Sequence, residues 1–185
     1  MIKFNNVTFS YSKENILNNF NLTINDGERI CLFAPSGYGK TTIFRLIMGL
    51  EKVNSGTIEG LDNIKISAVF QEDRLLPTKT LKENVALFGG EEKIDMILEK
   101  LNLSFASNRY PKGLSGGMAR RAAIARAINS GGDVYLLDEP FNGIDKENME
   151  KTAEYINEVT KDKTLILVTH SIYEAELLNC KIIEI

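Results

Sequence analysis

The sequence predicts an α/β fold with a mostly parallel sheet, an antiparallel β segment at its N-terminus and an inserted helical segment. Apolar runs at Val134–Leu137 and Thr164–Val168 have the composition of strands that are buried on both faces. A third apolar run, Ile30–Phe33, leads through a glycine-rich turn into an amphipathic helix. Residues 72–110 are mostly helical in pattern, so we expect them to form an insert between strands of the sheet.

Length and composition favour one soluble domain. The chain has 185 residues, which is enough for one domain with a sizeable core. Its formal net charge is −3, whereas a nucleic-acid binder typically has an excess of basic residues. No apolar run approaches the ~20 residues needed to span a bilayer, and the N-terminus lacks a signal-peptide pattern. The two cysteines, Cys31 and Cys180, have no metal-ligand spacing. We therefore expect a cytoplasmic chain that reaches a membrane only through partners and binds no nucleic acid.

The remaining elements follow from periodicity and turn residues. Residues 2–11 and 20–24 alternate apolar and polar side chains, as antiparallel strands do, and Asn25-Asp26-Gly27 predicts a turn. A stripe of Ile43, Leu46, Ile47 and Leu50 predicts the first helix. Further strands are expected at residues 55–58, 68–70 and 181–185, and further helices at residues 80–85, 91–101, 119–129 and 146–160.

The turn after the first apolar strand matches the phosphate-binding pattern G-x-x-x-x-G-K-[ST], except that Ala34 occupies the first position. Gly37 and Gly39 would let backbone N–H groups approach a polyphosphate. Lys40 would supply positive charge to the β- and γ-phosphates, and the Thr41 hydroxyl would ligate Mg²⁺. If position 34 required a positive φ, alanine there would cost about 1 kcal/mol, which we expect the loop to tolerate. An ordinary glycine-rich connection is the alternative.

Two further segments carry chemical groups. The strand Val134–Leu137 ends in Asp138 and Glu139; on a strand neighbouring the phosphate loop, Asp138 would hold Mg²⁺ and Glu139 would orient or deprotonate an attacking water. An ordinary acidic strand end is the alternative. In residues 112–118, KGLSGGM, Ser115 would cap the next helix and leave its first N–H groups open to an anion. The alternative is a plain Ser-Gly helix start.

The helix that follows contains three arginines, Arg120, Arg121 and Arg126. We expect them to form a basic face that is solvated or salt-bridged.

Taken together, six motifs resemble those of the ATP-binding cassette (ABC) ATPases, in the family's order and over nearly the whole chain. APSGYGKTT resembles Walker A, VFQEDRLLP the Q-loop, LSGGM followed by ARRAAIARA the signature, and VYLLDEP Walker B. Residues 141–145, FNGID, resemble the D-loop, and LVTHSIYEAE resembles the H-switch segment. The LSGG segment is the most discriminating, because other phosphate-loop proteins lack it.

The resemblance implies one ABC ATPase domain over residues 1–185, with a phosphate-loop NTPase core. Residues 1–71 and 130–185 would form the RecA-like core with its β subdomain, and residues 72–129 the helical subdomain that carries the signature. The implied ligands are ATP and Mg²⁺. The implied phosphate-binding residues are Ala34, Pro35, Ser36, Gly37, Tyr38, Gly39, Lys40, Thr41 and Thr42.

The resemblance also implies roles for single side chains. Glu139, His170 and Gln71 would be catalytic, with His170 contacting the γ-phosphate, and the metal ligands would be Thr41, Gln71 and Asp138. A structural histidine at a strand end, and a satisfied polar strand end at Gln71, are the alternatives. Tyr11 stands where the family has an aromatic ring that stacks on adenine; packing on its own sheet is the alternative.

One chain is not expected to close its own site, because the helical insert separates the signature from the phosphate loop. The resemblance implies a head-to-tail dimer, formed by two copies or with a second ABC ATPase, that buries two ATP molecules. Asp145 of the D-loop would position the opposite subunit. The signature residues that would complete the partner's γ-phosphate pocket are Leu114, Ser115, Gly116, Gly117 and Met118.

The implied function is ATP hydrolysis that energises solute transport through a membrane permease, with the chain peripheral on the inner face of the cell membrane. Residues 71–77 and LSGGM with ARRAAIARA resemble bacterial importer ATPases of the nitrate, sulfonate and taurine type. That group implies a permease helix docking near the Q-loop and an external solute-binding protein. The chain is short for the group, so we expect reduced C-terminal helices and no C-terminal regulatory domain. The alternatives are an ABC ATPase serving DNA repair or translation, and a regulatory nucleotide-binding module.

Overall fold

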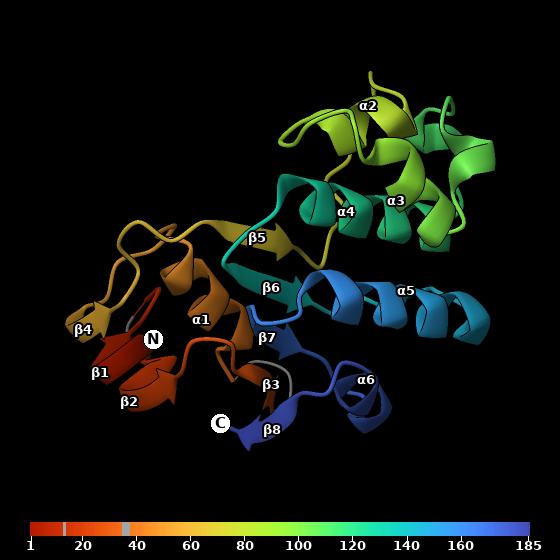
Figure 1. Ribbon diagram of the computed structural model, residues 1–185. Coiled ribbons are helices and arrows are strands. Elements are labelled where there is room, and N and C mark those ends of the chain that lie inside the picture. The colour runs from red at the N-terminus through yellow and green to blue at the C-terminus, as the bar shows by residue number, and fades with distance from the viewer. Residues whose placement is uncertain (13, 35–37) are drawn as a thin grey trace.

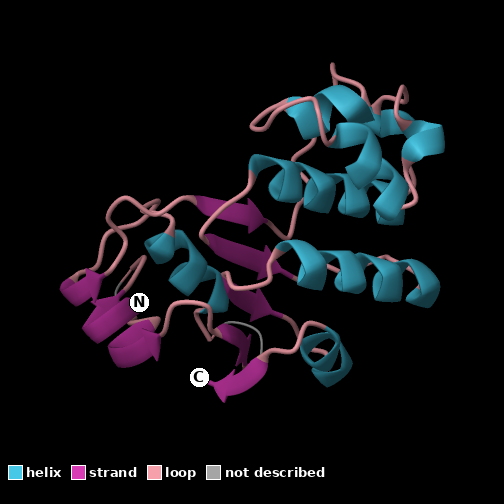
Figure 2. Ribbon diagram, viewed as in Figure 1, coloured by secondary structure: helices cyan, strands magenta, loops and turns pink. Residues whose placement is uncertain are grey.

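The computed structural model describes residues 1–12, 14–34 and 38–185. In this part of the chain a five-stranded parallel sheet has the order β5-β6-β7-β3-β8, and a three-stranded antiparallel sheet has the order β2-β1-β4 (Figures 1 and 2). The strands of the parallel sheet are β3 (Arg29–Phe33), β5 (Ile66–Val69), β6 (Val134–Asp138), β7 (Thr164–Val168) and β8 (Lys181–Glu184). Those of the antiparallel sheet are β1 (Ile2–Phe9), β2 (Leu17–Ile24) and β4 (Ser55–Glu59).

The parallel sheet lies between two apolar clusters, which explains why β6 and β7 are buried along their whole length. Alternate residues of β3 divide between the clusters, with Ile30 and Leu32 on one side and Cys31 on the other. The cluster that contains Ile30 also includes the inward side chains of the antiparallel sheet and of helix α1. The predicted α/β fold is therefore confirmed, with one sheet covered on both faces.

Helix α1 (Lys40–Ile47) follows β3 and lies between the two sheets in Figure 1. Its predicted apolar stripe is buried at Ile43, Leu46 and Ile47. Leu50, the last member of the predicted stripe, is 57% exposed, because the helix stops at Ile47 and Gly49 turns the chain with a φ of 68°. The sequence thus predicts the helix correctly and its end wrongly.

Residues 72–130 form the helical segment, at the top of Figure 1. Helix α2 (Leu81–Ala86) begins with a capping box in which Thr80 and Glu83 exchange hydrogen bonds. Helix α3 (Ile94–Lys100) starts three residues later than predicted, whereas α4 (Gly116–Ser130) starts three residues earlier, because Ser115 caps it directly. Two 3₁₀ turns, Ser104–Ala106 and Pro111–Gly113, connect α3 to α4.

Two features after α4 differ from the sequence expectation. Helix α5 (Lys146–Val159) lies as predicted, but α6 (Ile172–Leu177) was not predicted. Its signal is the spacing of Ser171 and Glu174, since the Ser171 hydroxyl accepts a hydrogen bond from the Glu174 N–H. In addition, β6 does not neighbour the phosphate-loop strand β3, because β7 pairs with both and lies between them. Asp138 therefore ends a strand that is two places from β3 in the sheet.

Candidate active site

A cavity of about 410 Å³ opens where the carboxyl ends of β6 and β7 meet the start of α1. Because all five strands are parallel, the chemical groups that follow them gather at one edge of the sheet. The lining combines the phosphate-loop lysine and threonines with both acidic residues of β6 and the single histidine. The lining residues are Ile16, Gly39, Lys40, Thr41, Thr42, Gln71, Asp138, Glu139, Val168 and His170.

The described part of the phosphate loop supports the predicted backbone requirement at Gly39. Its φ of 83° is left-handed, and a Cβ there would lie only 3.0 Å from the side chain of Ile16. Lys40 is buried, and its ammonium donates a 2.5 Å hydrogen bond to the carbonyl of Ala34. Tyr38 is 60% exposed. The predictions for Pro35, Ser36 and Gly37 lie outside the described residues.

The acidic end of β6 reaches the helix start although β7 intervenes in the sheet. The Thr41 hydroxyl lies 3.5 Å from a carboxylate oxygen of Asp138. Burial raises the pKa of Asp138 above its usual 3.8, against the opposing effects of Arg120, Thr41 and Lys40. Hydroxyl and carboxylate oxygens are ligands that Mg²⁺ accepts, so this pair fits the predicted metal. Among the described residues no group of three or more His, Cys, Asp or Glu side chains is arranged so that these alone could hold a metal ion.

Glu139 follows in an unusual backbone conformation. Its φ is 47°, left-handed for a residue that has a Cβ, and its N–H donates to the Val168 carbonyl at 2.8 Å. Its carboxylate lies 3.3 Å from Nε2 of His170, whose side chain is 53% exposed. Burial raises the pKa of Glu139, and the nearby His170 partly opposes that rise. The arrangement can hold a carboxylate base beside an exposed imidazole.

The three arginines of α4 do not form the predicted basic face. Arg120 and Arg121 are only 2% and 5% exposed, and Arg126 donates to the carbonyls of Asp73 and Arg74. Arg121 donates to the carbonyls of Leu101, Asn102 and Gly117. The solvated alternative was wrong, because loops that cover α4 present carbonyl oxygens that need donors. The salt-bridged alternative holds at Arg120, whose guanidinium pairs with the Asp73 carboxylate at 3.1 Å. The signal in the sequence is the alanine and isoleucine on every side of these arginines, which marks a buried helix.

The signature residues lie apart from the cavity. Of the described residues that line it, none comes from Leu114–Met118. Ser115 accepts a hydrogen bond from the Met118 N–H and so caps α4. Apart from its chain neighbours and its own helix backbone, no described atom lies within 4 Å of the place where a Cβ on Gly116 would sit, whereas a Cβ on Gly117 would lie 2.7 Å from the Gly143 carbonyl oxygen. Asp145 caps α5, since its carboxylate accepts from the Asn148 N–H at 3.1 Å.

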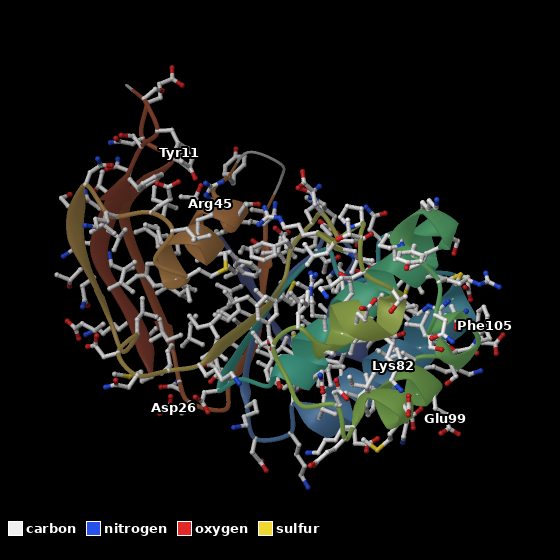
Figure 3. All side chains as sticks on the ribbon, turned by 90° about the horizontal axis from the view of Figure 1, so that it is seen from above. Tyr11, Asp26, Arg45, Lys82, Glu99 and Phe105 are labelled. Carbon is white, nitrogen blue, oxygen red and sulfur yellow. The ribbon has the colours of Figure 1, made fainter. Side chains whose placement is uncertain are left out.

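Tyr11 stands beyond the end of β1, on the side of the antiparallel sheet that faces α1, near Arg45 (Figure 3). Its ring meets that of Phe9 edge-on, with centroids 4.8 Å apart, and the Arg45 guanidinium lies 5.9 Å from the ring centre. The residue remains 54% exposed. Tyr11 therefore packs on its own sheet and still offers surface to a ligand.

A second, larger groove of about 740 Å³ lies between the end of α1, the edge strand β5 and the helical segment. It is mostly apolar and includes Phe70, Leu76, Leu87 and Phe88, of which Phe88 is 69% exposed. Arg74 lines it as well and stacks on Phe70, with the guanidinium 4.1 Å from the ring centre. This groove adjoins the segment that follows Gln71. None of the helices within the described residues has the length and apolar character that a bilayer span requires.

Comparison with known proteins agrees with this geometry. The profile of the ABC transporter family matches residues 17–142. The aliphatic sulfonates import ATP-binding protein SsuB 2 of Pseudomonas syringae pv. tomato is 36% identical, over 94% of this chain and 77% of that protein. The spermidine/putrescine import ATP-binding protein PotA of Haemophilus influenzae is 37% identical, over 99% of this chain and 55% of that protein.

A solved structure extends the agreement to the fold. The dimeric, post-hydrolysis state of the ATP-binding cassette MJ0796, bound to ADP and Pi, superimposes with a TM-score of 0.87 at 32% identity. The match covers 100% of this chain and 94% of that one. The predicted family, fold and ATPase function are confirmed. This chain belongs to the ABC transporter family, as an ATP-binding and ATP-hydrolysing subunit.

Proposed function

We propose that this chain powers an importer as one of two paired cassettes beneath a membrane permease. The observation that carries the proposal is the convergence of Lys40, Thr41, Asp138, Glu139 and His170 on one cavity of about 410 Å³. The importer assignment rests on the relatives described above, which are import ATP-binding proteins for different solutes. The expected alternatives in DNA repair or translation lose support, since those relatives serve transport.

ATP would bind with its phosphates at the start of α1. Residues 34–42 would surround them, Lys40 would move from the Ala34 carbonyl to the β- and γ-phosphates, and the adenine would stack on Tyr11. Thr41, Asp138 and Gln71 would hold Mg²⁺, which when bound neutralises phosphate charge.

Glu139 would act as the general base for the attacking water. Burial raises the pKa of Glu139, which makes its carboxylate a better proton acceptor. His170 lies at 3.3 Å from this carboxylate and is exposed enough to turn toward a γ-phosphate. Gln71, which directly precedes the helical segment and lines the same cavity, would contact the same phosphate.

A second cassette would complete the site. The lining residues of the cavity include none of Leu114–Met118 in the described chain, and Gly116 is open on the side where a Cβ would point. The N-terminus of α4, capped by Ser115, would therefore meet the γ-phosphate held by a partner. Asp145, near this surface, would position the opposite subunit. Loss of the γ-phosphate on hydrolysis would then release the pair.

The permease would contact the apolar groove of about 740 Å³. An amphipathic helix of the permease could bury Phe88 and Leu76 there, next to the loop that begins at Gln71. Residues 72–129 would then turn as a unit against the core and carry the signature with them. The chain itself would sit on the inner face of the membrane, with an external solute-binding protein supplying cargo to the permease.

The test replaces the proposed base without changing its shape. Glu139→Gln should keep ATP affinity, lower kcat by about 100-fold or more, and accumulate an ATP-bound dimer. A nucleotide titration measures ATP affinity, phosphate release measures kcat, and light scattering after gel filtration detects the dimer. Glu147→Gln is the matched control, because Glu147 pairs with Lys151 on the exposed surface of α5. Wild-type turnover by the Glu139 variant would reject the role of Glu139.

A further inference from the structure

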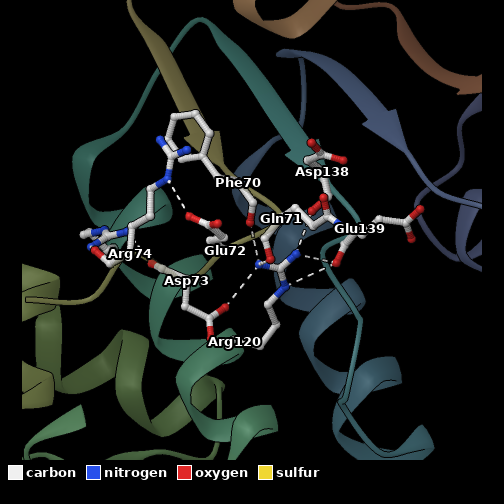
Figure 4. A network of polar contacts seen from close by, with 9 residues as sticks. Phe70, Gln71, Glu72, Asp73, Arg74, Arg120, Asp138 and Glu139 are labelled. Carbon is white, nitrogen blue, oxygen red and sulfur yellow. Dashed lines mark hydrogen bonds and ion pairs between the residues drawn. The ribbon is translucent and has the colours of Figure 1, made fainter. Parts of the chain in front are cut away.

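The guanidinium of Arg120 lies at the centre of a buried polar network (Figure 4). Its side chain is 3% exposed, and all three of its nitrogens donate hydrogen bonds. Five groups accept them, namely the carbonyls of Phe70, Gln71, Asp138 and Glu139 and the carboxylate of Asp73. Only Asp73 among these acceptors is charged, and it is 30% exposed.

These carbonyls belong to two strand ends. Val69 and Leu137 form the last pair of the β5–β6 ladder, so the carbonyls of Phe70 and Asp138 come just after the ladder stops. Arg120 donates to them at 2.5 and 2.6 Å respectively. The guanidinium therefore joins β5 and β6 at the point where they leave the sheet and enter the active site. It does so from α4, the helix that Ser115 caps.

The contact with Glu139 matters most. The left-handed φ of 47° at this residue is unfavourable for a side chain with a Cβ. Surrounding groups must therefore fix it. The Glu139 N–H donates to the Val168 carbonyl at 2.8 Å. Arg120 donates two hydrogen bonds to the Glu139 carbonyl, one from Nε at 3.2 Å and one from Nη2 at 2.5 Å. Hydrogen bonds therefore hold the Glu139 backbone at both its N–H and its carbonyl.

We propose that Arg120 is a positioning residue for ATP hydrolysis: it holds the Glu139 backbone in the conformation that points the carboxylate into the cavity. This inference rests on the proposed role of Glu139 as the base. Because Arg120 belongs to the helix of the signature and also binds the carbonyl of Gln71, the position of that helix sets the position of the base. Movement of the helical segment would thus shift the Glu139 carboxylate through the Arg120 side chain.

The decisive variant is Arg120→Lys, which keeps the charge but cannot form the planar fork. We expect kcat to fall about 10- to 100-fold with KM for ATP within about twofold of the wild type, since the base is misplaced and nucleotide binding is not. In the Glu139→Gln background the same change should lower the residual single-turnover rate by less than about threefold. A role confined to folding would lower both rates equally.

Arg29→Lys is the matched control for the loss of a half-buried guanidinium that donates several hydrogen bonds. Arg29 is the first residue of β3, so it lies at the amino ends of the strands, away from the cavity, and donates to the Leu178 carbonyl, to Thr160 and to Asn157. Both lysine variants should have lower melting temperatures, and at a temperature where circular dichroism finds both folded, only Arg120→Lys should lose kcat. Should Arg120→Lys prove unfolded, Asp73→Asn provides a milder test. It weakens one hydrogen bond of the network and leaves the Arg120 guanidinium in place. It should lower kcat in the wild-type background only.

The outcomes separate the two proposals. Normal turnover by Glu139→Gln would overturn the role of the base and this inference with it. If Glu139→Gln is inactive but Arg120→Lys lowers the rate by the same factor in both backgrounds, or raises KM as much as it lowers kcat, only the inference about Arg120 is overturned.

Discussion

Replacing Gly116 by alanine should make the isolated chain more stable and the working pair less active. Gly116 is the first residue of α4 and its φ is not positive. Apart from its chain neighbours and its own helix backbone, no described atom lies within 4 Å of the added Cβ, so the chain accommodates it without strain. Alanine also has less freedom in the unfolded state, which should stabilise the fold by about 0.4–1 kcal/mol. For a chain of this size that raises the melting temperature by about 1–4 °C.

The same methyl group should obstruct the partner's nucleotide. If a γ-phosphate of the second cassette approaches the N–H groups at the start of α4, a Cβ on Gly116 stands in its path. We expect kcat to fall at least about tenfold, and ATP-dependent dimerisation in the Glu139→Gln background to weaken. Melting curves without nucleotide, phosphate release and light scattering measure the three quantities.

Gly117→Ala separates this effect from simple damage. Its Cβ would lie 2.7 Å from the Gly143 carbonyl oxygen, so it should destabilise the isolated chain by about 1–3 kcal/mol. The reasoning would be refuted by a Gly116→Ala protein that is folded and hydrolyses ATP at the wild-type rate. It would also be refuted if Gly116→Ala lowered the melting temperature as much as Gly117→Ala.

Three further predictions concern single side chains. Lys40→Ala should weaken ATP binding about 10- to 100-fold in a fluorescent-nucleotide titration, because a charge-assisted contact to phosphate is lost; unchanged affinity would contradict the phosphate-loop assignment. Asp138→Asn should melt at a higher temperature than the wild type at pH 7, with the difference shrinking toward pH 4. The raised pKa of Asp138 means that its ionised form is penalised in the folded state, and this penalty is absent below the unfolded pKa, where both states are protonated. Asn84→Ala should cost about 2 kcal/mol, because this buried amide bonds the N–H of Leu76 and the carbonyls of Leu76, Lys79 and Thr80; a melting temperature within 1 °C of the wild type would argue against it.

Periodicity and motif order were sufficient for the strands and for the residues around the cavity. Local apolar runs determine that β6 and β7 are strands, and the chain order of the motifs brings Lys40, Asp138 and His170 to one sheet edge. Strand order is a different matter. Nothing in the run that ends at Asp138 reveals that β7 lies between β6 and β3, because pairing partners are chosen by the packing of the whole sheet.

The predicted exposure of the arginines on α4 was wrong for a similar reason, since it too depends on contacts between distant parts of the chain. Arg120 and Arg121 read as surface residues because arginine usually is one, and their burial depends on carbonyl oxygens that lie 18 to 50 residues away in the chain. Helix α6 could have been predicted from the Ser171 and Glu174 spacing. The end of α1 could have been predicted from Gly49, whose positive φ interrupts the apolar stripe before Leu50.

The uniform direction of the five parallel strands places their amino ends away from the cavity of about 410 Å³. Among the described residues at this end are the turns at Asp26 and Gly27 and at Asp162, whose exposed side chains line neither of the two cavities described above. The turns at the amino ends of the strands offer attachment points for a fluorophore or an affinity tag. Such a label would report the opening and closing of paired cassettes without altering the residues that bind ATP.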